Sequence, residues 1–73
     1  MNMNENQTRF VQCISTLLDA MLKLSKEWET NPEAQIHRHE LATQYPFPED
    51  LDEVFHKVAN WREAVVASFE GQG

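Results

Sequence analysis

Hydrophobic residues in the first third of the chain recur at alternating spacings of four and three. The series is Phe10, Ile14, Leu17, Met21, Leu24 and Trp28. At 100° per residue all of them fall within about 40° of one line, which is the pattern of an amphipathic helix. Val11, Leu18 and Leu22 widen this stripe on one side. Cys13 and Ala20 widen it on the other, so the apolar arc spans roughly 200°, more than one neighbouring helix can cover.

Proline positions predict where this helix ends and where a second one begins. Pro32 disfavours helical geometry at the residue before it, so the first helix should span about residues 5 to 29. Thr30 or Asn31 can cap a second helix in which Pro32 occupies the first position. This second helix should be short, about residues 32 to 44, and its weak apolar stripe means that neighbouring elements must hold it in place.

A third helix is predicted over about residues 49 to 70. Negative charge in its first turns interacts favourably with the free backbone N–H groups, and the acids there are Glu49, Asp50, Asp52 and Glu53. Apolar positions then repeat at spacings of three and four, at Leu51, Val54, Val58, Trp61 and Val65, with Phe55, Val66 and Phe69 beside them. Gly71 can end this helix in the left-handed conformation.

These elements predict an all-α fold, a small helical bundle in a single domain over residues 1 to 73, with frayed ends at 1 to 4 and 71 to 73. We expect the two long helices to pack side by side and the short helix to cover part of the cleft between them. A chain of 73 residues buries only about 60% of its unfolded surface, so association would aid its stability. We therefore expect the bundle to be completed by dimerisation or by a partner protein.

The residues expected at this interface are Val11, Leu18, Leu22, Trp28, Tyr45, Phe47, Trp61 and Arg62. Both tryptophans also suit packing at the ends of the bundle. Arg62 lies within the apolar arc of the last helix. Its stem should pack while its charged head extends past the edge of the bundle or pairs with an acid such as Asp19, or else Arg62 should form an ionic contact with another chain. Tyr45 and Phe47 lie outside the helical pattern. They either anchor a partner or, as we favour, fold back as a plug.

Charge and composition narrow the location and the partners. The formal net charge is -6, the wrong sign for direct binding to nucleic acid or to anionic membranes. The start of the chain lacks the pattern of a signal peptide, and no apolar run is long enough to span a membrane, so we expect a cytoplasmic protein. A single cysteine excludes an intrachain disulfide, and Cys13 is expected to be a small buried hydrophobe.

Candidate chemical groups are few, and we expect no catalytic residue, no cofactor and no metal. His37 and His39 differ by 200° on a helix and cannot share one ion, whereas His37 with Glu33 or Glu40 has a permissible spacing. His56 could in principle add a third ligand. The only glycines are Gly71 and Gly73, so the interior offers no phosphate-binding loop.

The function predicted from these features is a small acidic cytoplasmic protein-protein interaction module, a regulator, adaptor or inhibitor that binds another protein or itself without catalysis. The alternative is a nucleic-acid-linked regulator. In that case the acidic face of the last helix would mimic DNA, and less plausibly the last two helices would form a helix-turn-helix. A recognition helix is basic, whereas this helix begins with acids.

Overall fold

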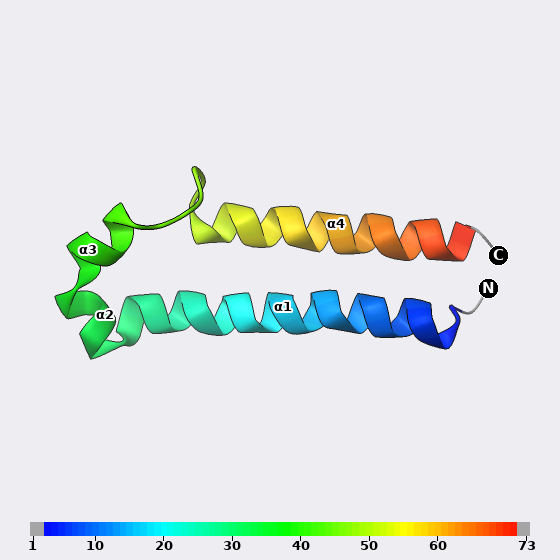
Figure 1. Cartoon of the computed structure of the whole chain (residues 1–73), viewed down its shortest axis with the longest axis horizontal. Coiled ribbons are helices and arrows are strands. Elements are labelled where there is room, and N and C mark those ends of the chain that lie inside the picture. The colour runs from blue at the N-terminus through cyan, green and yellow to red at the C-terminus, as the bar shows by residue number, and fades with distance from the viewer. Residues whose placement is uncertain (1–2, 72–73) are drawn as a thin grey trace.

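The computed structural model describes residues 3–71, and every element in that range is a helix. They are α1 (Glu5–Thr30), α2 (Pro32–Ile36), α3 (Arg38–Thr43) and α4 (Leu51–Gly71). Figure 1 shows α1 and α4 side by side and antiparallel, with α2 and α3 at one end and both termini at the other. The predicted all-α fold with two long helices that pack together is confirmed. The molecule measures 50 × 21 × 14 Å, so the hairpin is two helices wide and one helix thick.

Both ends of α1 are closed by asparagines. The Asn4 side chain accepts a hydrogen bond from the Gln7 backbone N–H at 2.8 Å, and the Gln7 side chain accepts one from the Asn4 N–H at 3.0 Å. This reciprocal pair is a capping box. At the other end Asn31 donates its backbone N–H to Glu27 at 2.7 Å, and its side chain accepts from the Glu33 N–H at 2.9 Å. Asn31 therefore ends α1 and caps α2, as the proline pattern predicts.

The predicted second helix is in fact two short helices. His37 interrupts it with φ -100° and ψ 17°, outside helical geometry. The Gln35 side-chain amide donates to the backbone carbonyls of Trp28 at 2.6 Å and Glu29 at 3.2 Å, which ties α2 to the end of α1. The expectation that this segment covers the cleft is wrong: among the described helices, α4 packs against α1 and α2 packs only against α1 and α3.

The start of α4 follows the prediction, and its end does not. Asp50 accepts a hydrogen bond from the Glu53 N–H at 2.9 Å, so one acid of the predicted cluster caps the helix. Glu49 instead pairs with Lys57 at 2.6 Å. Gly71 lies within α4, and none of residues 3–71 has a positive φ, so the left-handed end expected at Gly71 is absent from the described chain.

The core lies between α1 and α4 and is small. Its buried side chains are Val11, Ile14 and Met21, each less than one tenth exposed. Of the predicted six-residue stripe, Ile14 and Met21 are buried and Trp28 is half-buried. The other three members are exposed, at 47% for Phe10 and Leu17 and 53% for Leu24. The face that α4 covers is thus rotated from the predicted one, toward Val11 and away from Leu17.

Candidate interaction surface

Exposed apolar side chains follow one side of α1 along most of its length. They recur at spacings of three and four, at Phe10, Cys13, Leu17, Ala20 and Leu24, and all five are exposed. This series has the same period as the buried stripe and lies beside it on the helix. From the sequence alone, we assigned these residues to the buried stripe or to its edges. The spacing 10, 13, 17, 20, 24 is the signal that could have identified them as a second, separate series.

Trp61 adds an aromatic side chain from α4 to the same side of the hairpin. Its ring lies edge-on to that of Phe10, with centroids 6.2 Å apart and an interplanar angle of 87°. The Phe10 ring also contacts the half-buried Phe69 ring, with centroids 6.1 Å apart. Trp61 remains 50% exposed despite these contacts. We call the surface formed by Phe10, Cys13, Leu17, Ala20, Leu24 and Trp61 the open face.

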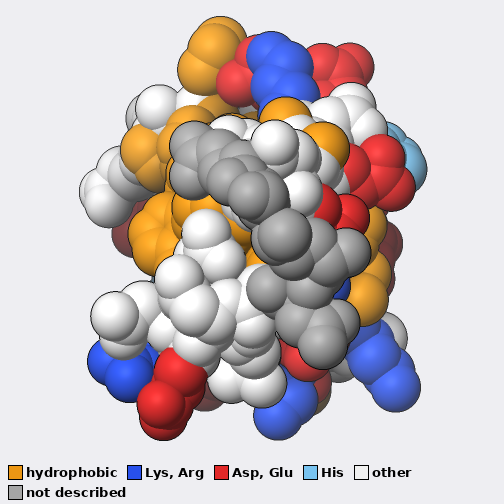
Figure 2. All heavy atoms as spheres, turned by 90° about the vertical axis from the view of Figure 1, so that its right-hand side faces the viewer, with side chains coloured by type: hydrophobic (Ala, Val, Ile, Leu, Met, Phe, Trp, Pro, Cys, Tyr) orange, Lys and Arg blue, Asp and Glu red, His pale blue; other side chains and the backbone are white. Residues whose placement is uncertain are grey.

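The opposite side of the hairpin is mainly polar on α1. Gln12, Asp19 and Lys26 follow one another at seven-residue spacing and are exposed, with Leu22 as an apolar exception at 55% exposed. Figure 2 looks at the molecule from the end that holds the termini, and the largest hydrophobic area in that view lies to one side, between charged groups. Among the exposed large apolar residues of α1 and α4, Leu22 lies on the polar side and the other four, Phe10, Leu17, Leu24 and Trp61, lie on the side described above.

The residues predicted at an interface fall into separate environments. Val11 is buried within its own chain and is not free to contact another, and Leu18 is half-buried in the same seam. Leu22 is exposed on the polar side, whereas Trp61 belongs to the open face. The guanidinium of Arg62 is engaged within the chain: its Nε donates to the Ser15 hydroxyl at 2.8 Å. The acid Asp19 is not its partner among the described salt bridges.

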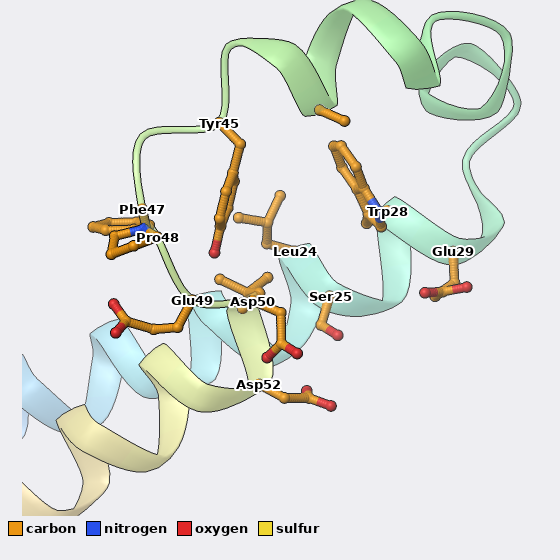
Figure 3. Close-up of a pocket in the computed structure, with 12 residues that line it drawn as sticks. Leu24, Ser25, Trp28, Glu29, Tyr45, Phe47, Pro48, Glu49, Asp50 and Asp52 are labelled. Carbon is orange, nitrogen blue, oxygen red and sulfur yellow. The ribbon is translucent and has the colours of Figure 1, made fainter.

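Tyr45, Trp28 and Phe47 line a hollow of about 550 Å³ between the connector and α1. Figure 3 shows the Tyr45 ring pointing from the connector toward α1 beside Leu24, with Phe47 on the other side of Tyr45 from Leu24. The two rings meet edge-on at 5.6 Å. Tyr45 is half-buried and Phe47 is 47% exposed, so the tyrosine lies as the plug interpretation requires and the phenylalanine does so only in part.

The Tyr45 hydroxyl is buried without a hydrogen-bond partner in the described structure. Burial raises the pKa of this phenol, and the negative charges of Asp50 and Glu49 raise it further. A neutral, poorly solvated hydroxyl next to two acids adds no polar contact to the plug. The ring's apolar area, rather than its hydroxyl, therefore holds the connector against α1.

Groups that could hold a metal are not brought together. Within residues 3–71, no three histidine, cysteine, aspartate or glutamate side chains are placed to share an ion. His37 lies 3.7 Å from Glu33, an exposed pair one helical turn apart. Cys13, expected to be buried, is exposed instead, because α4 covers the other side of α1.

Comparisons with protein-family models, with curated proteins and with solved structures give no match for this chain. Within the described range, no helix has both the length and the apolar character required to cross a bilayer. The geometry of the open face is therefore the feature from which a function can be argued.

Proposed function

We propose that this chain is a small protein-protein interaction module, a regulator, adaptor or inhibitor that acts by binding another protein chain through the open face. The observation that carries the proposal is the exposure, by about half, of Phe10, Leu17, Leu24 and Trp61 on one side of a helical hairpin. Isolated exposed apolar residues are ordinary, but a continuous series rimmed by polar groups is typical of an interaction surface.

Burial of the open face by a partner is favourable in free energy. Full burial of one leucine or phenylalanine side chain is worth about 1.5–3 kcal/mol, so burying the exposed half of each large residue is worth about 1 kcal/mol. With four such residues the gain is on the order of 4 kcal/mol before the costs of association. Because only three side chains among residues 3–71 are buried, such a contact would add a large share to the stability of the hairpin.

The mode of binding follows from the shape of the face. The open face is an apolar stripe along α1 with Trp61 of α4 beside it, and a pair of antiparallel helices with such a face can accept further helices as a bundle. An exposed single thiol on the face suits a reducing compartment such as the cytoplasm, where it stays unoxidised. The binding partner is thus expected to be a helical surface met in the cytoplasm.

The proposal is tested by immobilising the chain and identifying what it retains, an untagged copy of itself or a protein from its host. Leu17→Asp places a charge in the centre of the open face and should abolish retention. Gln12→Asp places the same charge on the polar side of α1 and is the matched control. Circular dichroism must show that both variants remain helical. Equal retention by the wild type and by Leu17→Asp would overturn the proposal.

A further inference from the structure

We propose that the open face is covered by a second copy of this chain, so that two hairpins form a four-helix bundle in which α1 of each copy packs antiparallel on α4 of the other. This inference rests on the proposed function and names the partner. It commits to a symmetric dimer with self-complementary faces, since both copies contribute the same surface.

The exposed area supports a partner of this size. The chain exposes 5800 Å², whereas a compact monomer of 8.5 kDa exposes about 4,700 Å². The excess of about 1,100 Å² exceeds the roughly 800 Å² that each partner buries in an interface of standard size. The thickness of the molecule agrees, because its shortest dimension of 14 Å is little more than one helix diameter. A second hairpin laid on the open face adds the missing layer.

The side chains of the stripe alternate in size, which suits interlocking with a second helix layer. Large residues at Phe10, Leu17 and Leu24 are separated by the small Cys13 and Ala20. On α4 the bulky Trp61 precedes the exposed Ala64 by three residues. Large side chains of one copy can therefore enter the spaces above small residues of the other, as packing in a bundle core requires.

Charge decides which helix faces which. Residues 49 to 71 carry Glu49, Asp50, Asp52, Glu53, Glu63 and Glu70 against only Lys57 and Arg62. If α4 met α4 of the second copy, two acidic helices would lie together, which is unfavourable. With α1 on α4 the repulsion is reduced, because α1 carries nearly as many bases as acids.

The hydrogen bond between Arg62 and Ser15 shows which positions of the two helices lie at the same level. In two antiparallel helices, moving a given number of residues forward along one helix reaches the same level as moving that number of residues backward along the other, because the rise per residue is the same. Lys23 is therefore close to the level of Glu53, and Cys13 is at the level of Ala64. In the proposed bundle, Lys23 of one copy borders Glu53 of the other, and Cys13 borders Ala64 of the other copy.

The last pairing gives a direct test by disulfide formation. Ala64→Cys introduces a thiol that should pair with Cys13 of the second copy under mild oxidation with oxidised glutathione. Most of the variant should then migrate at twice the chain mass on a non-reducing gel. Within one copy, both side chains are exposed and neither points into the seam between α1 and α4. A disulfide between Cys13 and position 64 of the same copy is therefore disfavoured, because the Cβ atoms of two bonded cysteines must lie about 3.8 Å apart.

Two control variants separate this arrangement from its competitor. The wild type and Cys13→Ser/Ala64→Cys should both stay uncoupled, because each has one thiol per chain and these lie diagonally across the bundle. Cys13→Ser/Leu17→Cys should couple only if α1 packs on α1. Coupling of that variant together with none for Ala64→Cys would overturn the proposed arrangement.

Retention on the immobilised chain distinguishes failure of this inference from failure of the proposed function. A chain that stays monomeric, yet retains a host protein that Leu17→Asp does not bind, overturns self-association and leaves the interaction function standing. A chain that retains neither itself nor a host protein overturns both.

Discussion

The Arg62 guanidinium donates from Nε to the Ser15 hydroxyl at 2.8 Å, a contact between residues 47 positions apart in the chain. It joins α4 to α1 near the middle of both helices. As a directional polar contact between two helices that otherwise meet through apolar side chains, this pair favours one alignment of α1 and α4 along their axes. That alignment determines which positions of α1 and α4 lie at the same level.

Ser15→Ala should lower the free energy of unfolding by about 1 kcal/mol, since the half-buried guanidinium loses an acceptor that water only partly replaces. Urea unfolding at one fixed protein concentration measures the change, because association would couple stability to concentration. Ser68→Ala removes an exposed hydroxyl from α4 and is the control. Equal midpoints for the two variants would show that the Arg62 contact does not contribute.

The helix boundaries were predictable because capping residues and prolines act locally. Asn31 and Pro32 determine the junction of α1 and α2 through the backbone groups next to them, and no distant contact is needed. Asp50 does the same at the start of α4. The interruption at His37 was not predictable, because no glycine or proline marks it. It occurs where the side chain of Gln35 ties α2 to the end of α1, a contact between separate elements.

The choice of the buried stripe was the main feature that sequence reasoning missed. Val11 and Leu17 belong to two apolar series of the same period, about one quarter-turn apart on one helix. Periodicity shows that both series exist but not which of them meets α4. The answer depends on the contact surface of α4, including its Arg62, and this is a property of the pair of helices. The wide apolar arc did indicate correctly that one partner leaves part of α1 uncovered.

Asn4→Ala should destabilise the chain by about 1 kcal/mol, because it removes the side-chain half of the capping box at the start of α1. Asn6→Ala, two residues further along, should be neutral or slightly stabilising because alanine has the higher helix propensity. Thermal unfolding followed by circular dichroism compares the two. A loss in Asn6→Ala as large as that in Asn4→Ala would argue against the cap.

The Glu49 and Lys57 pair predicts a defined dependence of stability on pH. The hydrogen bond from Lys57 lowers the pKa of Glu49 below its ordinary 4.5, and the same bond raises the pKa of Lys57 above its ordinary 10.5. The stabilising contribution of Glu49 is therefore present above its unfolded pKa and lost as the pH falls through the lower folded value. That of Lys57 is present below its unfolded pKa and lost as the pH rises through the higher folded value.

Glu49→Gln should consequently lower the melting temperature slightly at pH 7 and should leave it unchanged in strong acid, where the wild-type carboxyl is protonated. The exposed carboxyl of Asp52, removed in Asp52→Asn, serves as the control for a change of net charge. Melting temperatures measured from pH 2 to pH 8 give the comparison. A difference between wild type and Glu49→Gln that persisted unchanged in strong acid would contradict the role of this ion pair.

Tyr45→Phe should leave stability unchanged or raise it by about 1 kcal/mol, because it removes a buried hydroxyl that has no partner among the described residues. Tyr45→Ala should instead cost about 2 kcal/mol or more, since the half-buried ring packs against α1. Phe47→Ala, at a more exposed ring, should cost less. Urea midpoints rank the three variants. If Phe47→Ala proved the most damaging, the connector would be held by Phe47 rather than by Tyr45.

Sedimentation equilibrium across a range of protein concentrations tests the central claim most directly, that the open face joins two copies of this chain. The wild type and the Gln12→Asp control should approach twice the 8.5 kDa chain mass as concentration rises. The Leu17→Asp variant should remain at the single-chain mass while keeping its helical circular dichroism. A helical wild-type chain that sediments at 8.5 kDa at every concentration would contradict the account.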